Sequence, residues 1–111
     1  MTAEPEDAED QRWLVVDGRR WRRQDPALPE EVAAALLSHL GRGRSGTRVA
    51  RRDGDREAER VARRRTDLAK HGLGERGTAW WEQADEERRE RWEAALAALD
   101  EMDAGAAGPG D

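Results

Sequence analysis

The residues that could carry acid–base or nucleophilic chemistry are few and lie far apart. The sequence contains two histidines, His39 and His71, and no cysteine. The nearest approach to a catalytic set is His71 with Glu75 and Arg76, which would have to meet in a concave site to act together. His39 belongs to a predicted apolar helix face and has no carboxylate partner there, so we interpret it as a packed side chain. We expect no enzyme, no catalytic residue, no metal site and no cofactor.

The stretch from His71 to Trp81 contains the residues that we expect to contact a partner. It holds three glycines, which favour turns, and two adjacent tryptophans. Neighbouring side chains of an extended segment point to opposite sides, so one indole should enter the core and leave the other available. Trp80, Trp81, Glu75 and Arg76 therefore form the candidate site for an unknown protein partner. A local pair that stabilises the turn is the simpler interpretation of Glu75 and Arg76.

Arginine clusters support a second hypothesis, a module that binds nucleic acid. Indole rings stack on bases and guanidinium groups pair with phosphates, so arginines beside Trp13 and Trp21 fit this function. The candidate residues are Arg19, Arg20, Arg22, Arg63 and Arg64. The net charge of −5 opposes the hypothesis. Nineteen of the twenty basic residues are arginine, which we also interpret as a codon bias of GC-rich genes.

Two long segments carry opposite charge. Residues 42–65 contain ten arginines and four acids, a net charge of +6. Residues 82–103 contain nine acids and three arginines, a net charge of −6. If these segments meet within one molecule, they neutralise each other. If they meet between molecules, a homodimer follows, and high salt should weaken it.

Length and composition restrict the chain to one small domain. It has 111 residues, of which only nine are leucine and five valine, with no isoleucine or phenylalanine. Nineteen alanines favour helix, and five tryptophans supply bulk to a shallow core. We expect a single helical domain with an N-terminal hairpin over residues 11–102. An acidic tail at 1–10 and a second tail at 103–111 are expected to be disordered.

The N-terminal half contains a hairpin signal followed by a helix. Asp17-Gly18 between two short runs is typical of a two-residue β-turn, so residues 12–22 are predicted to form a hairpin. Pro29 suits the first position of a helix, and the apolar spacing predicts a helix over about 29–40 that stops at Gly41. Residues 41–47, rich in glycine and arginine, are predicted to be a flexible loop.

The C-terminal half is predicted to be helical over residues 48–71, with an interruption at 53–55 where Asp55 caps the second part. A last helix should start at residue 84 or 85 and run to about 102. The expected core anchors are Trp13, Trp21, Trp80 or Trp81, and Trp92. Together these elements predict a mainly α fold in which an N-terminal β-hairpin packs on a small bundle of three to four helices.

The expected cellular location of the protein rests on features that the sequence lacks. Without cysteine it can form no disulfide. The acidic start does not resemble a signal peptide, and no window contains the ~20 apolar residues that span a bilayer. We expect a cytoplasmic protein that is not inserted in a membrane.

Three motifs resemble those of one protein family. They are residues 12–21 (RWLVVDGRRW), residues 25–29 (DPALP) and residues 69–77 (AKHGLGERG) followed by Trp80-Trp81. Together they resemble small actinobacterial proteins that often carry the label "biopolymer transporter Tol". The resemblance covers about residues 12–99. It implies no defined activity, and the transporter label does not fit the expected cytoplasmic location.

Overall fold

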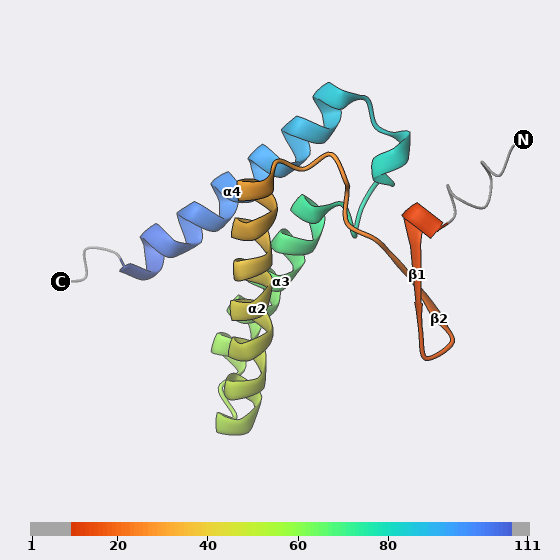
Figure 1. Cartoon of the computed structure of the whole chain (residues 1–111). Helices are drawn as coiled ribbons and strands as arrows, with labels where there is room; N and C mark the ends of the chain where they lie inside the picture. Colours follow the sequence, from red (N-terminus) through yellow and green to blue (C-terminus); the bar gives the residue numbers. More distant parts are fainter. Residues whose placement is uncertain (1–9, 108–111) are drawn as a thin grey trace, which may run out of the picture.

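The computed structural model describes residues 10–107, and they are mainly helical with one antiparallel hairpin. The fold class predicted from the sequence is therefore confirmed. Helix α2 (Glu30–Asp53) and helix α3 (Arg56–Leu73) run side by side in opposite directions, and α4 (Asp85–Ala107) crosses their upper end (Figure 1). A short 3-10 turn, η1 (Trp80–Glu82), leads into α4.

The hairpin consists of strands β1 (Trp13–Val16) and β2 (Arg19–Arg22). Its turn residues Asp17 and Gly18 have φ angles of 53° and 80°, as a two-residue turn between twisted strands requires. Leu14 pairs with Trp21 and Val16 with Arg19, so these side chains share one face of the ribbon. The ribbon projects from the helices and reaches them mainly through its base (Figure 1).

Helix α2 corrects one prediction, because it continues through residues 41–47 without a break. Two of its three glycines, Gly43 and Gly46, lie against α3, whereas Gly41 faces open space. A Cβ atom on Gly43 would lie 2.9 Å from the backbone nitrogen of Thr66 in α3 and 3.1 Å from the carbonyl oxygen of Ala62. The helix ends at Gly54, whose φ of 70° suits glycine.

Helix α3 begins as the sequence predicts and continues two residues beyond the predicted end, to Leu73. The Asp55 side chain accepts a hydrogen bond of 3.0 Å from the Ala58 N–H, so it caps the first turn. Gly74 ends the helix with a φ of 89°, and its N–H donates to the carbonyl of His71. This left-handed residue turns the chain toward Trp80.

The core lies where α4 crosses α2 and α3. Leu36, Leu73 and Leu99 are fully buried at its centre. The cluster is completed by Val32, Leu40, Ala69 and Ala95, with Leu28, Leu68, Trp92, Leu96 and Met102 at its margin. Trp80 is buried, which confirms it as an anchor, whereas Trp21 is 43% exposed and the prediction that it anchors the core is wrong.

The C-terminal boundary also differs from the prediction. Helix α4 continues to Ala107, so residues 103–107 are helical and not a disordered tail. The reason lies in Asp103, which accepts hydrogen bonds from Arg42 and Arg65 and ties the last turns to α2 and α3. The remaining predicted tails, residues 1–9 and 108–111, lie outside the described part of the chain, and Asp10 has helical backbone.

Candidate partner-binding groove

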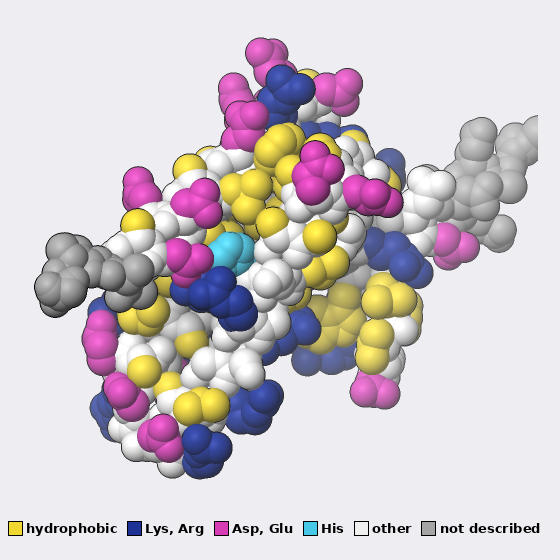
Figure 2. Space-filling model, turned by 60° about the vertical axis from the view of Figure 1, so that its left-hand side comes forward, with side chains coloured by type: hydrophobic (Ala, Val, Ile, Leu, Met, Phe, Trp, Pro, Cys, Tyr) yellow, Lys and Arg dark blue, Asp and Glu magenta, His cyan; other side chains and the backbone are white. Residues whose placement is uncertain are grey.

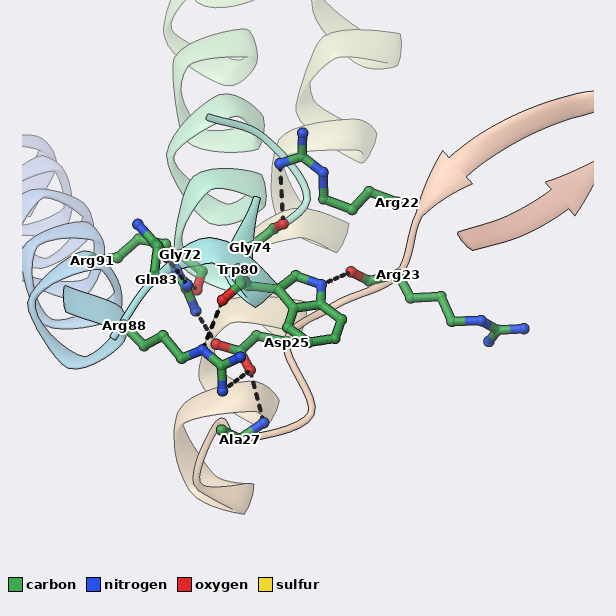
Figure 3. Close-up of polar contacts among 10 residues, drawn as sticks. All are labelled: Arg22, Arg23, Asp25, Ala27, Gly72, Gly74, Trp80, Gln83, Arg88 and Arg91. Atoms are coloured by element: carbon green, nitrogen blue, oxygen red, sulfur yellow. Dashed lines mark hydrogen bonds and ion pairs between the residues drawn. The ribbon is translucent and has the colours of Figure 1, made fainter. Parts of the chain in front are cut away.

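A buried carboxylate fixes the hairpin relative to the helices. Asp25, in the link between β2 and α2, is only 1% exposed. It accepts a hydrogen bond of 2.7 Å from Arg91 and one of 2.8 Å from the Ala27 N–H, while Arg88 lies at 3.6 Å (Figure 3). Its own N–H donates to the carbonyl of Leu73 at 2.8 Å. One residue, through its side chain and its backbone N–H, thus joins the N-terminal link, α3 and α4.

Further hydrogen bonds from the same arginines hold the turn between α3 and α4. Arg91 donates to the carbonyl of Gly72 and to the side chain of Gln83, and Arg88 donates to the carbonyl of Trp80 (Figure 3). Trp80 in turn donates from Nε1 to the carbonyl of Arg23, at 2.9 Å. This network was not predicted, because no local pattern in the sequence relates Asp25 to an arginine on a distant helix.

Arg22 attaches the end of β2 to the same turn. Its guanidinium donates to the carbonyl of Gly77 at 2.9 Å and to that of Gly74 at 3.5 Å. Trp81 packs between the hairpin and the turn, with ring centroids 5.6 Å from Trp13 and 5.1 Å from Trp80. The base of the ribbon is therefore held by aromatic and hydrogen-bonded contacts.

A groove of about 920 Å³ lies between the hairpin, the middle of α2 at Arg44 and the C-terminal part of α3 at Lys70. One wall is the ribbon face that carries Leu14, Val16 and Trp21, which are 42%, 46% and 43% exposed. Figure 2 shows hydrophobic side chains on the hairpin with basic side chains next to them. The other lining residues are Asp10, Gln11, Arg22, Arg23, Gln24, Pro26, Arg44, Lys70 and Glu75.

The helical side of the groove carries charge. Lys70 approaches the Trp21 ring, with 5.9 Å between its ammonium nitrogen and the ring centroid. Burial and then the charge of Arg76 lower the pKa of Lys70. Burial also raises the pKa of Glu75, against the opposing effect of Lys70 and Arg44. Both charged groups thus lose part of their hydration beside an apolar wall.

The predicted partner-binding residues are not all on one surface. Trp80 is buried, and Trp81 is half-buried with Arg12 placed 5.0 Å from its ring. Glu75 lines the groove, whereas Arg76 pairs with Asp67 at 2.6 Å. Glu75 is therefore the member of the set that faces the groove, and the exposed indole there is Trp21.

The predicted nucleic-acid residues are divided between several surfaces. Arg19 lies over Trp21 at 4.7 Å and Arg20 over Trp13 at 4.2 Å, on opposite faces of the ribbon. Arg22 binds backbone carbonyls at the base of the hairpin. On α3, Arg63 pairs with Glu59, and Arg64 is exposed.

The two segments of opposite charge meet within the molecule at Asp103. Its carboxylate pairs with Arg42 at 3.1 Å and with Arg65 at 2.9 Å. Other arginines of the basic segment pair with acids of that same segment, as Arg51 does with Glu59 at 2.9 Å. Helix α4 therefore neutralises the basic segment only around Arg42 and Arg65, among the ion pairs of the described residues.

Both histidines contact neighbouring residues of the fold. His71 Nδ1 lies 3.0 Å from the carbonyl oxygen of Asp67 and 3.5 Å from its carboxylate, which also pairs with Arg76, whereas Glu75 lines the groove. His39 is buried, and its Nδ1 lies 2.8 Å from Arg65. An arginine can only donate, so this nitrogen accepts and the ring is neutral. Among the described residues, no group of histidine and acidic side chains could hold a metal ion.

His39 is expected to make the fold sensitive to mild acid. Burial, followed by the charges of Arg65 and Arg42, lowers its pKa from the ordinary value of 6.5. The unfolded chain therefore takes up the proton first. The contribution of neutral His39 to stability is fully present above pH 6.5. It is lost as the pH falls from 6.5 toward the lower pKa of the folded state.

Urea unfolding at about pH 7.5 and about pH 5.5 would measure this effect as a difference in unfolding free energy. His39→Gln should reduce the difference, whereas His71→Gln, a change at a half-exposed ring, should leave it intact. An unchanged pH dependence in His39→Gln would contradict the assignment.

The chain has no significant match among protein-family models, curated proteins or solved structures. The resemblance to proteins labelled "biopolymer transporter Tol" stays a prediction. In the described part of the chain, no helix has the length and apolar character needed to cross a bilayer.

Proposed function

We propose that this protein is a non-enzymatic module that binds a segment of a partner protein in the groove between the hairpin and the helices. The observation that carries the proposal is the ribbon face of Leu14, Val16 and Trp21. Three large apolar side chains remain more than two-fifths exposed on one wall of a concave surface. Contiguous apolar surface beside polar residues is typical of binding sites, and tryptophan often anchors them.

Selection of random peptides displayed on phage, with the purified chain as bait, tests the proposal. Peptides that survive should lose at least about tenfold in affinity when Trp21 becomes serine, since a buried aromatic anchor contributes about 2 kcal/mol or more. Val16→Ser should weaken binding in the same direction. Val15→Ser is the matched control, because Val15 is a 63% exposed neighbour on the other face of the ribbon.

Failure of the selection to enrich any peptide would contradict the proposal. Equal affinity for wild type and Trp21→Ser would contradict it as well, because the peptides would then bind elsewhere. Circular dichroism of each variant shows whether the helices are retained. A cytoplasmic location is part of the proposal, and the absence of cysteine is compatible with it.

Nucleic-acid binding is the second candidate. It is favoured by the exposed ring of Trp21, which has Arg19 at 4.7 Å and Lys70 at 5.9 Å from its centroid. A base could stack there with phosphates near the cations. In the same assays, a labelled single-stranded oligonucleotide should bind and then dissociate steeply with added salt if this candidate is correct.

A further inference from the structure

A second hollow, lined by arginines, lies beside the groove. It has a volume of about 350 Å³ and is formed by α2, α3 and the turn that follows α3. Its lining residues are Arg44, Thr47, Arg51, Arg63, Thr66 and Arg76. Both threonine hydroxyls donate to backbone carbonyls of their own helices. The guanidinium groups are therefore the side chains of this arginine hollow that can still donate hydrogen bonds to a ligand.

The arginine hollow has more positive charge than its acids neutralise. Glu59 accepts from both Arg51 and Arg63, at 2.9 Å and 3.0 Å, and Asp67 accepts from Arg76. Arg44 forms no hydrogen bond or ion pair with any residue that the structure describes. Three of the four guanidinium groups pair with two carboxylates, and the nearby charges of Glu75 and Lys70 cancel, which leaves a charge of +2 at this surface. Such a surface attracts anions.

Arg44 also lines the apolar groove, so the two hollows share one residue as their common border. A chain that lies along Leu14, Val16 and Trp21 and passes Arg44 would next reach Arg51, Arg63 and Arg76. We propose that the arginine hollow is the second half of the binding surface and takes carboxylates of the same partner segment. The occupant is an extended protein segment in which apolar residues adjoin a run of Asp or Glu. This inference rests on the proposed function of the groove.

Complementarity of charge favours this occupant over nucleic acid. The apolar wall offers two aliphatic side chains with a single exposed indole, which suits a leucine or valine side chain better than a series of bases. Carboxylates form paired hydrogen bonds with guanidinium groups. An unpaired arginine, Arg44, lies where the apolar part of the segment would end.

The composition of selected peptides tests the inference. Phage selection on the wild-type chain at about 50 mM salt should enrich peptides with Asp or Glu next to apolar residues, and binding should weaken at about 500 mM salt. Arg44→Gln should reduce affinity by about two- to fivefold, as expected for a partly exposed ion pair. Arg48→Gln is the matched control, because Arg48 lies one turn further along α2 and does not line either hollow.

A double-mutant cycle then locates the contact. When the acids of a selected peptide are replaced by Gln or Asn, Arg44→Gln should lose most of its effect. Peptides that are apolar without acids, and that bind Arg44→Gln as tightly as wild type, would overturn the inference and leave the groove as a binding site. Peptides that ignore Trp21→Ser would overturn both proposals. Dimerisation through Arg44 would also overturn the inference, and sedimentation of wild type and Arg44→Glu would show it. Binding of an oligonucleotide in place of peptides would overturn it as well.

Discussion

Asp25→Ala is expected to destabilise the folded chain by about 3–5 kcal/mol, because it leaves buried arginines without their counter-charge. Asp25 is 1% exposed, and the side chains of its partners Arg88 and Arg91 are 19% and 10% exposed. The change also removes the acceptor for the Ala27 N–H. Since a small domain has only about 5–15 kcal/mol of stability in total, the change should remove a large fraction of it.

Urea unfolding followed by circular dichroism would measure this effect. Asp67→Ala is the control, since Asp67 forms an exposed ion pair with Arg76 that should contribute less than about 1 kcal/mol. Asp25→Asn keeps an oxygen acceptor without the charge, so its loss should be smaller than that of Asp25→Ala. A change below about 1 kcal/mol for Asp25→Ala would mean that the buried carboxylate does not hold the fold together.

A pair of glycine substitutions should have opposite signs. Gly43→Ala is expected to cost about 1–3 kcal/mol, because its methyl group meets the α3 backbone at Thr66 and Ala62, which cannot move aside as a side chain would. Gly41→Ala, in the same helix, meets nothing within 4 Å. It should stabilise the protein by about 0.5–1 kcal/mol through the better helix propensity of alanine.

The two variants differ only in which side of α2 receives the methyl group. Thermal or urea unfolding of both, compared with wild type, therefore separates helix propensity from helix packing. If Gly43→Ala were as stable as Gly41→Ala, then α2 and α3 would not be in contact at this point.

Local signals predicted many of the elements. Asp17-Gly18 indicated the hairpin, Asp55 the start of α3, and the first turn of α2 follows Pro29 as expected. Each of these depends on backbone conformations and hydrogen bonds within a few residues, which a short window of sequence contains.

The errors came from features that depend on contacts between distant residues. Glycine at positions 41, 43 and 46 is compatible with a loop and with tight helix packing, and only α3 decides between them. Likewise, the alternation in the hairpin predicted two faces without showing that the face with Trp21 stays uncovered. The groove depends on that face, so its location could not be predicted.

The network around Asp25 could not be predicted from the sequence for the same reason. Asp25 and Arg91 are separated by 66 positions, and neither belongs to a recognisable motif. The predicted partner-binding set was centred on the indoles of Trp80 and Trp81 because they are adjacent in the chain. In the structure, both rings help to attach the hairpin, and the exposed apolar face of Leu14 and Trp21 lies on the other side of the ribbon.

Attachment of the ribbon through its base has a consequence for dynamics. The strands bond mainly to each other, so their amides should open locally and exchange hydrogen at a lower free energy than those of Leu36 or Leu99. A partner that lies against Leu14 and Trp21 would restrict this opening. Its affinity would then include the entropic cost of immobilising the ribbon, and slower exchange across β1 and β2 would report occupancy even where no helix moves.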